Sequence, residues 1–157
     1  MQTSKLNKML KVFIIGVTLF ALCKQQALSQ SPNTTYPIRA SLPALLKGTF
    51  EDDYGIRYTI SDSLWIQHPN AKYHIINCDT TEQYLLVQND NANKTDAGLF
   101  TRIDYMNFTG MEPFLWGFCL TIYNANTLEK AKATIIADRR NPKIGCSGFP
   151  FSRMKKL

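Results

Sequence analysis

The sequence predicts a mainly β protein: an antiparallel meander barrel of seven or eight strands with one C-terminal helix packed on it. Three observations predict this fold class. Seven short runs rich in β-branched and aromatic residues follow one another between residues 49 and 123. Most of the segments between them are short and polar, which is typical of antiparallel hairpins. Helical periodicity appears only after the last run, so a parallel sheet with crossover helices is not expected.

The first 29 residues have the pattern of a signal peptide. A basic start precedes residues 12–22, an apolar run of eleven that is too short to span a bilayer and suits a signal core. The triplet ALS that ends at position 29 predicts cleavage before Gln30, and with it export to the periplasm or the extracellular space. Cys23 follows Leu22, whereas bacterial lipoproteins have a small residue there, so a lipid anchor through Cys23 is not expected.

Cleavage changes the charge of the chain. Four of the 18 Lys and Arg residues and none of the 12 Asp and Glu residues lie in the signal segment, so the net charge falls from +6 to +2. The charge therefore gives no basis for a nucleic-acid partner. Residues 30–41 are polar with two prolines and are expected to form an exposed lead-in. Residues 42–157 suit one domain, and no second apolar run is long enough for a transmembrane segment.

The β-type runs define the expected strands. A short helical turn within residues 42–48, closed by Gly48, precedes them. The irregular tail after the helix has room for one last short strand. The seven expected strands are 49–53, 56–60, 64–67, 73–78, 83–89, 99–105 and 114–123.

The C-terminal helix is expected over residues 127–138. Asn126 is a candidate N-cap, and Glu129 stands three residues later in the capping-box position. The helix is expected to end before Asn141-Pro142. Four apolar residues fall near one stripe that should pack on the sheet: Leu128, Ala131, Ile135 and Ile136.

Three cysteines remain after cleavage, which leaves one thiol over if a disulfide forms. Cys119 lies in an aromatic strand and Cys146 in an irregular tail. A bridge that fixes the tail to the sheet is the most useful pairing, so we expect Cys119–Cys146. The pattern leaves Cys78–Cys146 open.

The order of elements resembles the lipocalins and the wider calycin-like barrels. Their members start with a helical turn that leads into Gly-x-Trp on the first strand, and here Gly48 and Phe50 stand in those places. Many carry Thr-Asp-Tyr near a late strand, and here "TRIDY" gives Asp104-Tyr105 in a similar place. They place a helix after the barrel and a cysteine beyond it, like Cys146. The resemblance covers most of residues 45–150 and implies a small apolar ligand.

Three consecutive acids, Glu51, Asp52 and Asp53, end the first expected strand. Strand alternation places Asp52 on the opposite face from the other two, so the three carboxylates do not converge. Gly55 follows in a turn, and Arg57 on the next strand is available for a cross-strand ion pair. The stretch predicts the polar end of a hairpin rather than a pair of catalytic carboxylates.

The sequence offers no recognisable metal or catalytic constellation. The Asn- and Asp-rich segment 88–98 lacks EF-hand spacing and is interpreted as a hairpin loop. His74 and Cys78 share a strand face but lie about 13 Å apart along it, too far to share one ion. No Gly-x-Ser-x-Gly motif or activated cysteine is present. We expect no metal, no cofactor and no enzymatic activity.

Aromatic residues suggest a pocket inside the barrel. In the strand 114–123, alternation places Trp116 and Phe118 on one face together with Ile122. Aromatic side chains also fill small barrels without any ligand, and this alternative stays open. The candidate pocket lining is Trp65, Tyr84, Phe100, Arg102, Asp104, Trp116 and Phe118.

Two of these candidates are charged, and their orientation matters. Arg102 and Asp104 share a strand face with Phe100. If that face points inward, the two charges have to pair with each other or with a polar group of a ligand. If it points outward, they are surface residues.

The sequence therefore favours a secreted or periplasmic lipocalin-like protein that binds a small, largely apolar ligand. The alternative is a non-enzymatic structural or interaction module of the cell envelope or extracellular space, with a filled barrel core and a protein or envelope partner. A continuous interior cavity distinguishes the first from the second.

Overall fold

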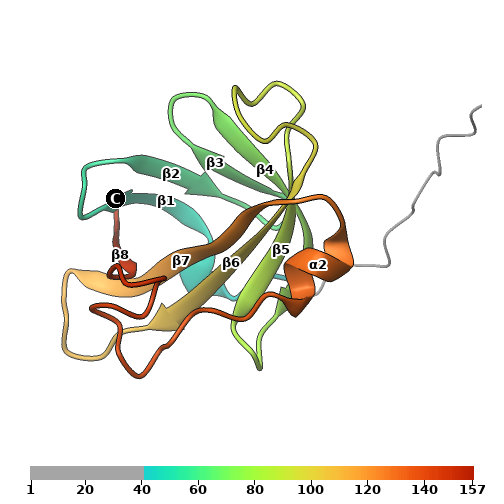
Figure 1. Cartoon of the computed structure of the whole chain (residues 1–157). Coiled ribbons are helices and arrows are strands. Elements are labelled where there is room, and N and C mark those ends of the chain that lie inside the picture. Colours follow the sequence, from blue (N-terminus) through green and yellow to red (C-terminus); the bar gives the residue numbers. More distant parts are fainter. Residues whose placement is uncertain (1–40) are drawn as a thin grey trace, which may run out of the picture. The chain divides into compact units, whose positions relative to one another are not determined.

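The computed structural model describes residues 41–157; the expected signal peptide, the cleavage before Gln30 and the lead-in up to residue 40 lie outside the described residues. Eight strands form a closed barrel in meander order (Figure 1). They are β1 (Gly48–Asp52), β2 (Arg57–Ile60), β3 (Leu64–Gln67), β4 (Ala71–Asp79), β5 (Tyr84–Asn89), β6 (Phe100–Asn107), β7 (Phe114–Ala125) and β8 (Ser152–Lys156); the 3-10 helix η1 (Ala44–Leu46) precedes them, and the helix α2 (Leu128–Ala133) follows β7. Within residues 41–157, no helix has the length and apolarity needed to cross a membrane.

The last strand, β8, closes the barrel. It pairs with β7, where Phe118 lies opposite Ser152, and with β1, where Phe50 lies opposite Lys156. Closure gives each strand a neighbour on both sides, which protects its backbone hydrogen-bonding groups. The predicted fold class is confirmed: the barrel has eight strands, and one short helix follows β7.

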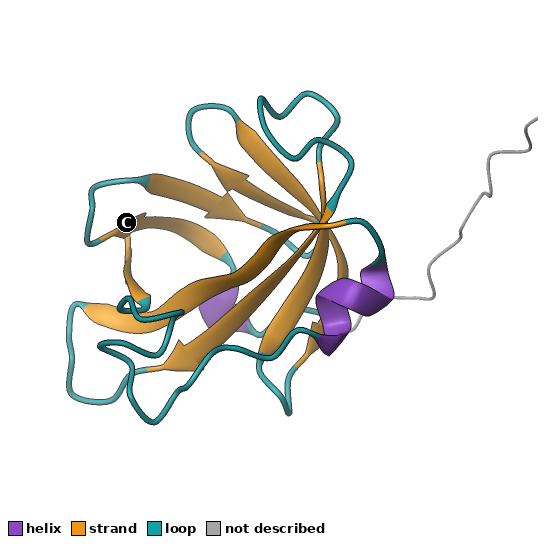
Figure 2. Ribbon diagram, viewed as in Figure 1, coloured by secondary structure: helices purple, strands orange, loops and turns teal. Residues whose placement is uncertain are grey.

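Apolar side chains pack in two clusters, one on each side of the barrel wall. In β5, Leu85 and Val87 belong to the interior cluster, whereas Tyr84 and Leu86 belong to a smaller outer cluster. This is the alternation expected of a strand that is covered on both faces. Ala131 of α2, fully buried, caps the outer cluster. Figure 2 shows α2 lying against the outside of the barrel.

The segment before β1 plugs the barrel. Leu42 and Leu46, on either side of the η1 turn, are buried in the interior cluster. Asp62, in the turn between β2 and β3, accepts hydrogen bonds from the Leu42 backbone N–H at 2.9 Å and from the Ser41 hydroxyl at 3.1 Å. These bonds, led by the one from Leu42, and the Lys47 ammonium at 3.3 Å lower the pKa of Asp62. The carboxylate thus fixes the approach of the chain to the barrel.

Asp52, the middle acid of the opening stretch, is buried and organises the β1–β2 hairpin. Its carboxylate accepts hydrogen bonds from the backbone N–H groups of Tyr54 and Ile56, at 2.9 and 2.8 Å. It also accepts one from the Tyr58 hydroxyl at 2.9 Å. Burial, with the Asp52 charge beside it, raises the pKa of Tyr58 far above its ordinary value, so the phenol stays protonated and donates.

The other two acids point away from the barrel interior and form ion pairs. Glu51 lies 2.8 Å from the Lys155 ammonium and 3.7 Å from the Arg57 guanidinium, and the Lys155 hydrogen bond lowers its pKa. Asp53 lies 2.8 Å from the Arg153 guanidinium. The structure therefore places the acids as expected, at the polar end of a hairpin.

The C-terminal helix is shorter than predicted. The sequence pattern predicts residues 127–138, but the helix spans Leu128–Ala133. Its N-cap is Thr127 and not Asn126: the Thr127 hydroxyl accepts a hydrogen bond from the Lys130 backbone N–H at 3.1 Å. Both residue types are good N-caps, so their order along the chain does not decide between them.

Side-chain branching and a distant anchor explain why the helix ends early. The predicted apolar stripe includes Ile135 and Ile136, but their side chains are 76% and 48% exposed. Together with Thr134 they form a β-branched run, which loses side-chain freedom in a helix. Further along the chain, the Arg139 guanidinium donates to the Tyr105 carbonyl at 2.8 Å. An extended segment covers more distance per residue than a helix, so it allows Arg139 to reach this carbonyl.

A disulfide fixes the tail to the barrel wall. Cys119 of β7 is bonded to Cys146, with their Cα atoms 5.5 Å apart, while Cys78 is a buried free thiol. The predicted pairing is confirmed, and the Cys78–Cys146 alternative is excluded. Burial raises the pKa of the Cys78 thiol, which keeps it protonated and unreactive in the folded protein.

Removing this disulfide is expected to lower the free energy of unfolding by roughly 3 kcal/mol, because the cross-link restricts a large loop of the unfolded chain. The Cys119→Ser/Cys146→Ser double variant, compared with wild type by urea denaturation, measures the loss. A Cys78→Ser variant is the control, since it removes a thiol and no cross-link. Equal stability of the double variant and wild type would contradict a structural role for the bridge.

Candidate functional site

Three of the candidate pocket residues pack together in the centre of the barrel. Trp65, Trp116 and Phe118 are 1%, 0% and 5% exposed. The Trp65 ring meets Phe118 edge to face, with centroids 5.1 Å apart, and Trp116 in the same way at 6.0 Å. Phe50 and Tyr58 extend the network by further edge contacts. Aromatic side chains therefore fill this part of the interior.

The other four candidates lie on the outer side of the wall, beneath α2. Tyr84 and Phe100 belong to the outer apolar cluster. The Arg102 guanidinium lies over the Tyr84 ring at 4.0 Å from its centroid and donates to both carboxylate oxygens of Asp104, at 2.9 and 3.0 Å. The face of β6 that carries Arg102 and Asp104 points outward. Both side chains are nevertheless buried, because α2 and the C-terminal tail cover them.

Asp104 is the centre of a clamp between the barrel, α2 and the tail. In addition to Arg102, its carboxylate accepts hydrogen bonds from Arg139 at 2.9 Å and from the Thr121 hydroxyl. The second terminal nitrogen of Arg102 donates to the backbone carbonyl of Lys132 on α2 at 2.6 Å. These contacts satisfy the buried charges and give Arg102 and Asp104 a structural role.

The loop between β5 and β6 is held by contacts within the loop and by contacts with β4. Asp90 accepts a hydrogen bond from the Ala92 backbone N–H at 2.8 Å and lies 2.7 Å from the His74 ring, and these contacts lower its pKa. These contacts agree with the interpretation of the segment 88–98 as a hairpin loop. In the described part of the chain, no three His, Cys, Asp or Glu side chains converge on a position that suits a metal ion.

A hollow of about 300 Å³ opens where the β3–β4 turn, the β5–β6 loop and the end of β7 meet. Its walls include Tyr73 and Leu120, which also pack against the interior cluster, so the hollow lies at the mouth of the barrel, next to the aromatic centre. We call it the mouth hollow. It is lined by Asn70, Ala71, Tyr73, Asn89, Asn93, Lys94, Thr95, Asp96, Leu120 and Tyr123.

One buried amide holds the rim of the mouth hollow in place. Asn89 is 3% exposed, and its side-chain nitrogen donates to the backbone carbonyls of Asp96 and Tyr123, both at 2.9 Å. Its side-chain oxygen accepts from the Thr101 hydroxyl at 2.6 Å. The loop, β6 and β7 are thus joined through one side chain, which favours a preformed hollow.

Among the residues that the structure describes, the charged side chains of the mouth hollow lack hydrogen-bond and ion-pair partners, in contrast to the hydrogen-bonded Asn89. The carboxylate of Asp96 and the ammonium of Lys94 make no hydrogen bond or ion pair with residues 41–157. Burial, and then the Asp96 charge, raise the pKa of Tyr73, so its phenol is neutral at physiological pH. The hollow therefore combines aromatic and aliphatic walls with one unpaired acid and one unpaired base.

A β-bulge explains why sequence reasoning missed this site. Simple alternation places Ile122 on the interior face, together with Trp116. It places Tyr123 on the opposite face. The register between β6 and β7 shifts next to Arg102, and Ile122 packs in the outer cluster while Tyr123 lines the mouth hollow with Leu120. An inserted residue exchanges the two faces of a strand, and no single-residue signal in the sequence marks it.

Comparisons with known proteins identify no relative of this chain. No family model matches the chain, and neither the curated proteins nor the solved structures give a match. The architecture is an eight-stranded antiparallel barrel in meander order followed by a helix, and it is consistent with a calycin-like fold.

Proposed function

We propose that the protein is an exported, non-enzymatic binding protein of the lipocalin type, which holds a compact, largely apolar molecule in the mouth hollow. One observation carries the proposal. Interior side chains fill the centre of the barrel, but those at the mouth leave about 300 Å³ open beside Tyr73, Leu120 and Tyr123. Ligand pockets of proteins measure about 300–1,000 Å³, so the occupant is small.

The walls indicate the chemistry of the ligand. The rings of Tyr73 and Tyr123 and the side chain of Leu120 offer flat and aliphatic surface to an apolar body. Asp96 and Lys94 offer one charge of each sign at the rim, so a polar substituent on the ligand finds a partner of either kind. A ring compound with one or two polar groups meets both conditions.

Export supports the same proposal. The disulfide between Cys119 and Cys146 suits an oxidising compartment, in agreement with the signal pattern of the first 29 residues. The closed barrel and the bridged tail give the site a stable frame.

Replacing Tyr123 with alanine is expected to weaken the binding of the neutral apolar probe N-phenyl-1-naphthylamine about two- to tenfold, since an aromatic contact contributes about 0.5–1.5 kcal/mol. Stability should change little, because the Tyr123 side chain is 54% exposed. Fluorescence titration of the probe gives the affinity, and urea denaturation gives the stability.

Ile135→Ala is the control: this apolar side chain is 76% exposed, follows α2 and lines neither the mouth hollow nor any other pocket named here. It should leave probe binding unchanged. Equal affinity of wild type and Tyr123→Ala for the probe, or no saturable binding to the wild type, would count against a ligand site at the mouth.

A filled barrel that binds a macromolecular partner is the second candidate. The packed aromatic centre favours it, and so do apolar side chains exposed on the tail, where Ile144 is 63% and Phe149 71% exposed. Exposed apolar residues that lie close together often mark an interaction surface. Absence of probe binding together with capture of an envelope component through the tail would favour this function over the first.

A further inference from the structure

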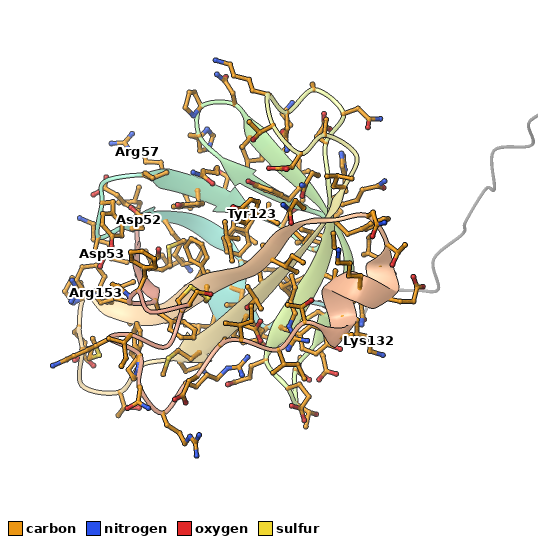
Figure 3. All side chains as sticks on the ribbon, viewed as in Figure 1. Asp52, Asp53, Arg57, Tyr123, Lys132 and Arg153 are labelled. Carbon is orange, nitrogen blue, oxygen red and sulfur yellow. A yellow bond between two sulfur atoms is a disulfide. The ribbon has the colours of Figure 1, made fainter. Side chains whose placement is uncertain are left out.

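A second hollow, of about 440 Å³, lies outside the barrel between the β1–β2 turn, the β6–β7 loop and the tail. We call it the tail pocket. Figure 3 shows Asp53 and Arg153, which belong to it, well apart from Tyr123 of the mouth hollow. Its apolar lining is Tyr54, Phe108, Met111, Pro142, Pro150 and Phe151.

A glycine lets the floor of the tail pocket form. A Cβ atom on Gly117 of β7 would lie 2.8 Å from the Phe108 ring, closer than such contacts occur, so the absence of a side chain lets the Phe108 ring approach the strand closely. Phe151, 1% exposed, completes the floor, and its backbone N–H donates to the Pro142 carbonyl at 2.9 Å. The bridge at Cys146 fixes this part of the tail. The pocket is therefore a built feature of the fold.

The charges of the tail pocket favour an anion. Arg153 is paired with Asp53 at 2.8 Å and lies over the Phe114 ring at 4.7 Å from its centroid. Lys143, by contrast, is exposed and makes no hydrogen bond or ion pair with the residues that the structure describes. Two cationic groups and one carboxylate line the pocket, which leaves an excess of one positive charge next to an apolar floor.

We propose that the tail pocket is a second binding site, for a small amphipathic anion whose apolar body lies on Phe108 and Phe151 and whose acidic head meets Lys143. Its volume suits a monomeric small molecule, because pockets of about 300–1,000 Å³ hold such ligands. The site is independent of the mouth hollow, since no residue lines both.

Calorimetric titration with sodium decanoate tests the site, with decanol and decyltrimethylammonium as neutral and cationic partners of equal chain length. Wild type should bind decanoate saturably at one site and the cation more weakly. Lys143→Gln should lower the affinity for decanoate about two- to fivefold, as expected when one exposed ion pair is lost. Lys132→Gln, an exposed lysine on α2, should leave the affinity unchanged.

Two further variants separate the sites. Met111→Ser, at a side chain that is 38% exposed, should weaken decanoate binding without unfolding the protein, as circular dichroism will show. Tyr123→Ala should leave it unchanged. The proposal is overturned if the cation binds with the same affinity as the anion, or if Lys143→Gln and Lys132→Gln have equal effects on decanoate binding. It is also overturned if Tyr123→Ala abolishes decanoate binding. Binding only to vesicles of anionic phosphatidylglycerol, and not to decanoate, would also overturn it.

Discussion

Trp116→Ala is expected to lower the free energy of unfolding by about 3–5 kcal/mol, the usual cost of removing a close-packed aromatic side chain from a core. Trp116 is fully buried and lies edge-on against Phe50 at 5.3 Å and Trp65 at 6.0 Å between ring centroids. The hole left by the indole lies among rings that have no room to collapse into it. Urea denaturation followed by far-ultraviolet circular dichroism measures the change.

Trp116→Phe serves as the control for shape. The Trp116 indole N–H has no hydrogen-bond acceptor within residues 41–157, so phenylalanine removes a buried donor that makes no bond. We expect this variant to be markedly more stable than Trp116→Ala. A loss below about 1 kcal/mol for Trp116→Ala would contradict a filled centre and point to a hollow interior.

Asp104→Ala is expected to destabilise the protein by about 3–5 kcal/mol, because the buried Arg102 guanidinium then loses its counter-charge. The side chains of Arg102 and Asp104 are 5% and 1% exposed, so water cannot replace the lost partner. Arg139 loses its ion pair with Asp104 in the same step, which loosens the start of the tail. Thermal and urea unfolding should show the loss at pH 7.

Arg140→Ala is the matched control for this clamp. Arg140 pairs with Asp138 on the surface, where its side chain is 91% exposed. Surface ion pairs contribute little, so unfolding of this variant should match wild type. If Asp104→Ala and Arg140→Ala had equal effects, the buried cluster would not hold α2 and the tail against the barrel.

Much of the fold was predictable because period-two alternation and short turns are local signals. The runs 64–67 and 114–123 agree with β3 and β7 to within two residues at each end. The sequence indicated a bridge from the irregular tail to the sheet and favoured Cys119–Cys146, but it left Cys78–Cys146 open because Cys78 also lies in a strand, and the structure decides between them. The closing strand β8 was weakly marked, since "SRMKK" is short and mostly polar, and its pairing with β1 depends on long-range contacts.

The candidate site was less predictable, for three physical reasons. The face of a strand follows alternation only until a bulge, and the shift next to Arg102 moves Tyr123 to the mouth. Burial beneath a helix and a tail is a tertiary property, so Asp104 could not be assigned to a buried clamp. The tail pocket depends on the close approach of Phe108 to Gly117, which sequence spacing does not show.

Nuclear magnetic resonance provides the most direct test of where the barrel binds its ligand. The chain has two tryptophans, and both indole N–H signals report on the filled centre. In a titration of ¹⁵N-labelled protein with N-phenyl-1-naphthylamine, the backbone amides of Asn93, Asp96 and Tyr123 should shift to saturation, while the two indole signals stay in place. Saturating shifts of the Trp65 and Trp116 indoles, with the three amides unchanged, would contradict a site at the mouth and place the ligand in the centre.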